Sequence, residues 1–323
     1  MLMRERRPAT RNAPVQDFDR FDHFLSTGSV PEGRFSIRYQ NVPVDFLYEP
    51  VENARTTVIF FHGAATGTVS LPWHPGRRVM EGIRANRLAI SDPSLALDSS
   101  FNLTLGWHAG SSAQPRLQYF IETVIRRIQE VTGISNLVFV GGSGGGFASL
   151  EMSRRFPGSV VVAMNPQTSI GKYLPFAVRR YLDLSWDGVA VLDEISKYST
   201  HDLVEGYPRV LNHTVAYVQN TRDTFHIENH QIPFFEKIGE SPRVFMLMDA
   251  WGDPEGTGHV VPPHSLVRNV VRHLVAANGG WKRTLVDLGF NHHTTAVTVE
   301  RAVKKSVKTF SSSPPSSPLA RLE

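Results

Sequence analysis

Apolar and polar residues alternate along the central part of the chain in blocks that predict strands and helices in turn. Short apolar runs predict strands at residues 33–40, 42–50, 56–63, 86–93, 136–140, 159–166, 214–220 and 243–249. Apolar residues recur at helical spacing in residues 115–133, 147–158 and 264–278. Strands that are apolar throughout, with helices between them, indicate an α/β fold with a mostly parallel, eight-stranded type of sheet flanked by helices. Ligands and catalytic groups gather at the carboxyl ends of the strands in such a sheet.

Three segments depart from this pattern. Residues 1–33 are polar and predict an irregular N-terminal segment, in which "FDRFDHFL" can lie against the body as a short amphipathic piece. Residues 301–323 are rich in Ser, Pro and basic side chains and predict a disordered tail. The domain itself is therefore expected at 34–300. Within it, residues 168–212 are longer than an ordinary connection, and we expect them to form a lid over the strand ends.

The charge of the chain is concentrated at its two ends. The total is +4, but residues 1–12 carry +3 and residues 301–323 carry +4, which leaves about −3 for everything between them. A nucleic-acid-binding protein needs clustered cations on the folded domain itself. We therefore expect no nucleic-acid partner.

Other compositional features narrow the class further. The chain has no cysteine, which excludes disulfides, thiolate metal sites and a cysteine nucleophile. No secretory signal or run of about 18 apolar residues is present, so we expect a cytoplasmic protein without a transmembrane segment. No motif for a nicotinamide, flavin or metal cofactor is found, and we expect none.

The most informative stretch is "FVGGSGGGFASL" at residues 139–150, where five glycines surround Ser143 between a predicted strand and a predicted helix. No Lys follows the glycines, which excludes a Walker-type phosphate loop, and the spacing does not fit a dinucleotide fingerprint. The remaining match is G-x-S-x-G, the nucleophile elbow. In such a turn the small residues let the strand and the helix approach closely and leave the serine hydroxyl exposed.

A serine nucleophile needs a base that is itself held by an acid. In this topology the expected order along the chain is serine, acid, histidine. Asp223 follows the strand at 214–220, and His259 lies in a Gly-rich loop after the strand at 243–249. We therefore predict a triad of Ser143, Asp223 and His259. Asp249 and Asp253 remain alternatives for the acid, and His264 remains one for the base.

The expected oxyanion hole consists of two backbone N–H groups. We predict the amide of Gly144, which follows the nucleophile, and that of Ala64 in "FFHGAATG", with Ala65 as the alternative.

With these motifs in place, the chain resembles the α/β-hydrolase family over about residues 35–275. The motifs that carry the resemblance are "FFHGAATG", "GGSGGG", "QNTRD" and "GTGHVVPP". The resemblance implies a serine esterase, lipase, peptidase, thioesterase or acyltransferase. A narrower likeness, in "LGWHAG", "SGGGFASL" and "MNPQTSIGKY", is to bacterial members associated with surface-glycan and accessory-secretion systems, some of which are O-acetyltransferases or esterases on glycans. Gly142 departs from the commonest pattern, because a bulkier residue usually precedes the serine.

We therefore expect a serine hydrolase that cleaves a small or medium acyl ester on a small molecule or a glycan, rather than a long-chain lipid. The predicted substrate contacts offer several hydrogen-bonding groups, which suit a hydroxylated substrate; they are Trp107, His108, Gln167, Tyr173 and His226. The alternatives are an O-acyltransferase on a glycan and a binding module that has kept the fold without turnover. Asp223, His226 and His230 also form D-x-x-H-x-x-x-H, which allows a metal site or a set of hydrogen bonds around the acid loop.

Overall fold

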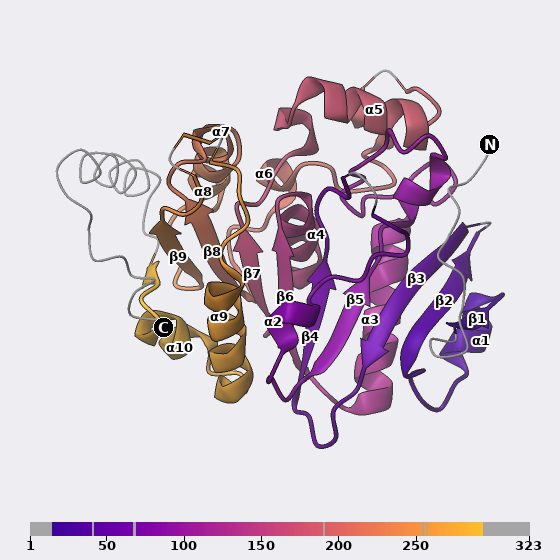
Figure 1. Cartoon of the computed structure of the whole chain (residues 1–323), viewed down its shortest axis with the longest axis horizontal. Helices are drawn as coiled ribbons and strands as arrows, with labels where there is room; N and C mark the ends of the chain where they lie inside the picture. The colour runs from indigo at the N-terminus through magenta and orange to yellow at the C-terminus, as the bar shows by residue number, and fades with distance from the viewer. Residues whose placement is uncertain are drawn as a thin grey trace.

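The computed structural model describes residues 15–40, 42–66, 69–189, 191–253, 255–256 and 258–292. Over these residues ten strands form a single sheet in the order β1-β2-β3-β5-β4-β6-β7-β8-β9-β10 (Figure 1). The strands are β1 (Val15–Phe18), β2 (Gly33–Tyr39), β3 (Val42–Glu49), β4 (Thr56–Phe61), β5 (Asn86–Ile90), β6 (Asn136–Gly142), β7 (Val160–Met164), β8 (Thr214–Asn220), β9 (Val244–Asp249) and β10 (Asn291–His292).

Strands β4 to β9 pair in parallel, with β4 between β5 and β6. β3 is antiparallel to both of its neighbours, β2 and β5, and β10 closes the opposite edge antiparallel to β9. The mostly parallel sheet expected from the apolar runs is therefore confirmed, and the eight expected strands correspond to β2–β9. The segment expected to be irregular also contributes a strand, because β1 pairs in parallel with β2.

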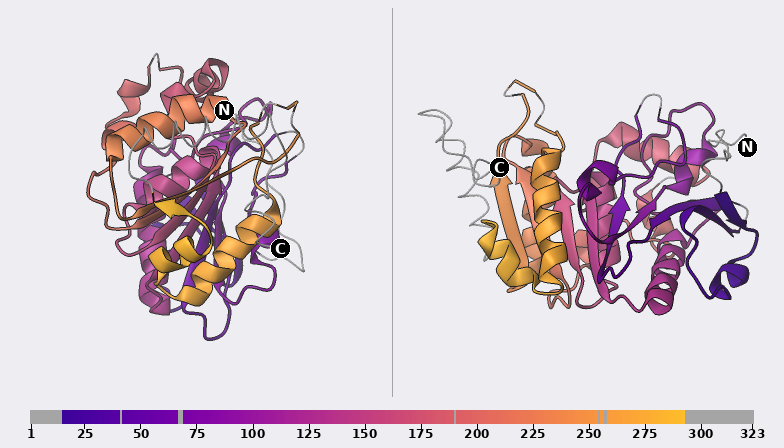
Figure 2. Two further views of the ribbon diagram at one scale, coloured as in Figure 1. Left: turned by 90° about the vertical axis from the view of Figure 1, so that its left-hand side faces the viewer. Right: turned by 60° about the horizontal axis from the view of Figure 1, so that its bottom comes forward.

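Helices cover both faces of the sheet (Figure 2). Helices α3, α4 and α8 bury their apolar sides in one core, and α2, α9 and α10 bury theirs in the other. The α-helices are α1 (Phe21–Leu25), α2 (Arg77–Met80), α3 (Leu117–Thr132), α4 (Gly144–Ser153), α5 (Pro175–Ser185), α6 (Leu203–Gly206), α7 (Thr224–His226), α8 (Ile232–Ile238), α9 (His264–Ala277) and α10 (Trp281–Asp287). The 3₁₀ turns are η1 (Pro93–Leu97), η2 (Ile170–Lys172) and η3 (Leu192–Ile195), and η4 (Ile227–Gln231) is π-helical.

The connection between β7 and β8 contains η2, α5, η3 and α6. Helix α5 lies above the carboxyl ends of the central strands, where the lid was expected (Figure 1). Tyr181 of α5 is buried, and its hydroxyl donates a hydrogen bond to the carbonyl of Gly110 (2.9 Å). The segment is thus packed onto the domain, and its action as a lid stays a prediction.

The tail predicted at 301–323 lies outside the described residues. In the part of the chain that is described, no helix combines the length and the apolar character needed to cross a bilayer.

Candidate active site

Ser143 lies between the end of β6 and the first residue of α4, at the carboxyl edge of the sheet. Its backbone has φ 54° and ψ −122°, a region that a residue with a side chain rarely adopts. The amide of Ser143 donates to the carbonyl of Met164 (2.9 Å), and its carbonyl accepts from the amide of Gln167 (3.2 Å). These bonds to the neighbouring β7 end hold the strained turn that the G-x-S-x-G motif predicts.

The glycines around Ser143 provide steric clearance. A Cβ on Gly141 would lie 2.1 Å from the Gly145 carbonyl oxygen, and one on Gly145 would lie 2.4 Å from the Phe61 carbonyl oxygen. A Cβ on Gly146 would lie 2.6 Å from the Cβ of Pro166. Helix α4 can therefore press against β4 and β6 only because these positions have no side chain. At Gly142 the nearest atom to such a Cβ is 3.5 Å away, so this position has room.

The structure brings together the three residues predicted as a triad, although they come from three separate loops. The Nε2 atom of His259 is 3.0 Å from the Ser143 Oγ, and its Nδ1 is 2.6 Å from Oδ2 of Asp223. Since the carboxylate accepts from the Nδ1–H, Nε2 is left to accept the serine hydroxyl proton. The order of these contacts is that of a nucleophile, a general base and an orienting acid.

The alternatives named for the triad have different surroundings. Asp249 and Asp253 accept hydrogen bonds from the nearby amides of Ala250 and Glu255. His264 begins helix α9 and is exposed.

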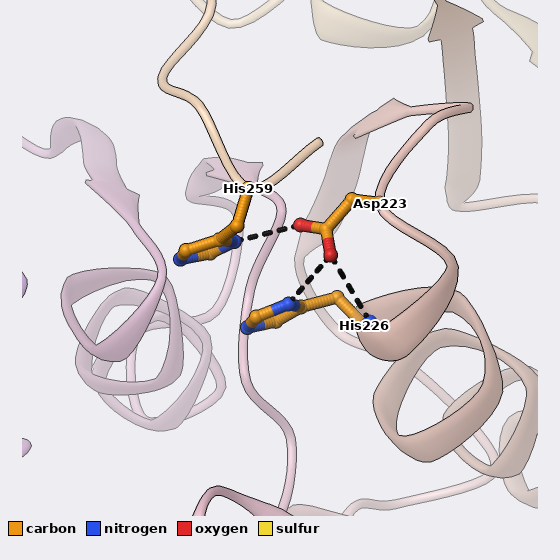
Figure 3. Close-up of side chains that lie close together, drawn as sticks. All are labelled: Asp223, His226 and His259. Carbon is orange, nitrogen blue, oxygen red and sulfur yellow. Dashed lines mark hydrogen bonds and ion pairs between the residues drawn. The ribbon is translucent and has the colours of Figure 1, made fainter. Parts of the chain in front are cut away.

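Asp223 is buried and accepts hydrogen bonds at both carboxylate oxygens. Besides His259, it accepts from the backbone amide of His226 (3.2 Å) and from His226 Nδ1 (2.9 Å), and it caps helix α7 (Figure 3). Burial alone would raise the pKa of Asp223, but the hydrogen bonds from His226 and His259 outweigh it and hold the pKa well below its usual value. The carboxylate is therefore charged throughout the neutral pH range.

The two segments predicted to supply the oxyanion-hole amides lie against each other at the elbow. Gly63 lies against the elbow, because a Cβ added to it would be 3.5 Å from the Ser143 Cβ and 3.8 Å from the Gly144 nitrogen. The amide of Ala65 is already bonded to the carbonyl of Thr104 (2.7 Å), which leaves Ala64 as the better candidate in this loop. Ala64 and Ser143 border the same cavity.

Two buried residues that the sequence analysis did not single out hold this loop. His62 donates from Nδ1 to the Gly63 carbonyl (2.8 Å) and accepts at Nε2 from the amide of Asp92 (2.9 Å). Burial lowers the pKa of His62, so the ring is neutral in this arrangement. Asp92 in turn accepts from the amide of His108 (2.9 Å). The position of Asp92, two residues after the end of β5 and at the carboxyl edge of the sheet, is the signal that could have found it.

A chain of side-chain hydrogen bonds leads from Trp107 through Gln167 to Ser143. The indole N–H of Trp107 donates to Oε1 of Gln167, and Nε2 of Gln167 donates to the Ser143 Oγ (3.1 Å). The bond from Trp107 orients the amide so that its N–H group faces the serine. Trp107 and His108 both have positive φ, 55° and 52°, and both are buried. Two consecutive non-glycine residues with positive φ form a strained stretch of backbone, which the surrounding structure must hold in place.

The five predicted substrate contacts are therefore mostly inside the protein. Trp107, His108, Gln167 and His226 are buried, and Tyr173 is half-buried with its ring edge-on to Trp107. The other four lie around Ser143 and Asp223, whereas His108 packs against His62 in the loop that follows β4. Burial lowers the pKa of His108 to about 3.

A cavity of about 600 Å³ borders Ser143. Its lining is largely apolar and comes from α2, α9 and the ends of β4, β6 and β7; the residues include Trp73, Val79, Met164, Val260 and Val267. Ser143, His259 and Ala64 border it, and none of the five predicted substrate contacts does. The volume is within the range of roughly 300–1,000 Å³ that small-molecule sites occupy.

Among the described residues, one group has ligand atoms close enough to share a metal ion, namely Asp223, His226 and His259, within 4.8 Å of one another. In this arrangement both Nδ1–H groups donate to the carboxylate. An ion between them would have to replace both protons.

Comparison with known proteins places the fold. No family model and no curated protein matches the chain. Among solved structures, it is similar to the capsule O-acetyltransferase of Neisseria meningitidis serogroup A, with a TM-score of 0.51 and 15% identity over 74% of this chain and 96% of that one. It is also similar to the Pyrococcus horikoshii acylaminoacyl peptidase, with a TM-score of 0.51 and 11% identity over 79% and 42% of the two chains. A third similar structure is a 2,6-dihydroxy-pseudo-oxynicotine hydrolase, with a TM-score of 0.50 and 11% identity over 80% and 69%. The predicted α/β-hydrolase fold is thereby confirmed.

Proposed function

We propose that the protein is a serine-dependent acyl-ester hydrolase that works through an acyl-enzyme intermediate on Ser143. The observation that carries this proposal is the continuous chain of contacts from Asp223 through His259 to the Ser143 Oγ, at 2.6 Å and 3.0 Å. The three side chains lie at the carboxyl ends of strands on an α/β-hydrolase fold, where such a site is expected.

In the first half of the reaction, the Ser143 Oγ attacks the acyl carbonyl and His259 Nε2 takes the hydroxyl proton. Asp223 stabilises the imidazolium, and the amides of Gly144 and Ala64 stabilise the oxyanion. Collapse of the tetrahedral intermediate breaks the bond to the leaving alcohol, which receives the proton from His259. In the second half, water loses a proton to His259 and attacks the acyl-enzyme. The bond to the Ser143 Oγ then breaks, His259 returns the proton to Oγ, and the acid is released.

The cavity beside Ser143 is the site that we assign to the acyl group. Its apolar lining matches an acyl chain and not the hydroxyls of a sugar, so a carbohydrate leaving group would lie outside it. This refines the substrate expected from the sequence: an ester of a small or medium acyl group, whose alcohol part can still be a glycan.

Acyl transfer to a sugar hydroxyl is the second candidate. It uses the same acyl-enzyme, and the acceptor hydroxyl takes the place of water. The motifs shared with glycan-associated members and the similarity to a capsule O-acetyltransferase favour it.

Product analysis separates the two candidates. Purified protein is incubated with p-nitrophenyl acetate, with and without a sugar acceptor, and Ser143→Ala serves as the control. A hydrolase releases acetate in both reactions, whereas a transferase forms acetylated sugar at the expense of acetate. Turnover by Ser143→Ala at the wild-type rate would reject both.

A further inference from the structure

The carboxylate of Asp223 holds two imidazoles, of which the proposed mechanism uses one. Its Oδ2 accepts from His259 Nδ1 (2.6 Å), while its Oδ1 accepts from His226 Nδ1 (2.9 Å) and from the His226 amide (3.2 Å). An acid that orients one histidine needs a single oxygen for that task. The second histidine, held in the same way on the other oxygen, requires its own explanation.

The two rings are stacked face to face. Their centroids are 3.9 Å apart, and their planes differ by 5°. Figure 3 shows that the two ring ends carrying Nε2 point to the same side. The Nε2 of His259 meets Ser143, whereas the Nε2 of His226 is buried and meets no hydrogen-bond partner in the described part of the chain. His226 therefore duplicates the orientation of the base without reaching the nucleophile.

His226 is neutral in this position. Its Nδ1 faces a charged carboxylate and so carries the ring proton. Burial lowers the pKa of His226, and the hydrogen bond to Asp223 acts in the opposite direction but is outweighed. A neutral ring face lies against the ring that becomes an imidazolium during the reaction, and such a face stabilises a cation.

The other titratable groups that face this pair are also neutral. His230 accepts at Nδ1 from the amide of Thr168 (3.3 Å), and burial lowers the pKa of His230 to about 3. Burial raises the pKa values of Tyr173 and Tyr217, so both hydroxyls keep their protons. Of the described groups that face the pair, Asp223 therefore carries the charge in the resting state. The D-x-x-H-x-x-x-H motif is used here for hydrogen bonding and stacking.

We propose that His226 is a positioning residue that sets both the orientation and the proton affinity of His259. Its Nδ1–H binds the second carboxylate oxygen and tempers the attraction of Asp223 for the His259 proton. Its ring face fixes the plane of His259 and supports the imidazolium. The proposal rests on the proposed function, since it concerns the base of that reaction.

Two substitutions separate these two effects. His226→Phe keeps a stacked ring and removes the hydrogen bond to Asp223. His226→Asn keeps an N–H donor close to the position of Nδ1 and removes the stacked ring. If His226 only filled space, both substitutions would change the labelling rate of Ser143 by a factor that does not depend on pH.

The measurement is the rate of Ser143 labelling by a fluorophosphonate probe between pH 5 and pH 9. In His226→Phe we expect the acid limb of the profile to move to higher pH by about half a unit to one unit, because the carboxylate loses a donor and holds the proton on His259 more strongly. In His226→Asn we expect the acid limb to move in the opposite direction, to lower pH, because the imidazolium loses the stacked ring face, and the plateau to be about tenfold lower. Acid limbs that coincide in the wild type and both variants would overturn the proposal.

NMR titration of the imidazoles in the wild-type protein provides a second test. It does not require that the variants fold or that Ser143 reacts with the probe. We expect His226 to be the neutral Nδ1–H tautomer throughout pH 5–8. A His226 ring that gains a proton in this range, or that carries its proton on Nε2, would overturn the proposal. Absence of labelling in the wild type would instead contradict the proposed function and leave this NMR result as the test of His226.

Discussion

The two sides of Ser143 differ in chemistry and in access. One side, the cavity side, is the apolar cavity bounded by Trp73, Val79, Met164, Val260 and Val267. The other, the buried polar side, consists of Trp107, Gln167, Tyr173 and His226, which are wholly or half buried and contact the triad or one another. The polar residues predicted to contact a substrate thus form hydrogen bonds and ring contacts around Ser143 and Asp223, and the cavity beside Ser143 lies among apolar residues.

This division follows from the cost of burying polar groups. A buried amide, indole or imidazole must be hydrogen-bonded, and the bond then fixes its orientation. Substitutions on the buried polar side should therefore lower the rate of the chemical step. Those on the cavity side should alter which acyl groups are accepted. The following predictions test this contrast, from the largest expected effect to the smallest.

Removal of the base should have the largest effect. We expect His259→Ala to lower kcat/KM for p-nitrophenyl acetate by about 10³–10⁶-fold, as when a member of a triad is lost. His264→Ala is the matched control, because His264 borders the same cavity but begins helix α9 and is exposed. It should stay within a fewfold of the wild type. Equal losses in the two variants would contradict the assignment of His259 as the base.

The buried polar side should affect kcat more than KM. Gln167→Ala removes an N–H donor from the Ser143 Oγ, and a hydrogen bond of this kind is worth about 1–3 kcal/mol, or roughly 5- to 150-fold in kcat. Trp107→Phe removes only the donor that orients Gln167, and we expect a smaller loss. The double variant should be no slower than Gln167→Ala alone, because both substitutions act through one hydrogen bond.

Trp186→Phe provides the control for this pair, since Trp186 is a buried tryptophan in the segment between β7 and β8. It should leave kcat close to that of the wild type. Losses for Trp107→Phe and Gln167→Ala that simply add would contradict the shared chain of hydrogen bonds.

Substitutions on the cavity side should have the smallest effect on kcat/KM, and that effect should depend on the length of the acyl chain. Each buried methylene contributes about 0.8 kcal/mol, so kcat/KM should rise by roughly fourfold per added CH₂ from acetate until the cavity is filled. Val267→Trp should shorten the preferred chain and leave acetate hydrolysis almost unchanged. Val286→Trp, at an exposed position of α10, is the control. A chain-length profile that Val267→Trp does not alter would place the acyl group elsewhere.

The parts of this picture that could be predicted from the sequence are those with a local signature. The glycines around Ser143 report a close approach of strand and helix, and Asp223 and His259 follow apolar strands whose ends meet at one edge of the sheet. The direction in which a side chain points is not determined by the local sequence. Trp107 turns inward because two consecutive residues adopt positive φ, and nothing in "LGWHAG" specifies that conformation at non-glycine positions.

The cavity could not be predicted for a related reason. Val79 and Val267 occupy apolar positions of α2 and α9, as core residues do, and the space between these helices depends on their packing. Likewise, His226 and His259 are 33 residues apart in the sequence, and their stacking depends on the path of the loop after β9.

Covalent labelling of Ser143 tests the central claim most directly. The purified protein is treated with a fluorophosphonate probe at neutral pH, and the modified peptide is identified by mass spectrometry. We predict one label per chain, on Ser143, with no label in Ser143→Ala and a strongly reduced labelling rate in His259→Ala. A wild-type protein that does not react, or a Ser143→Ala variant labelled as fast as the wild type, would contradict the account.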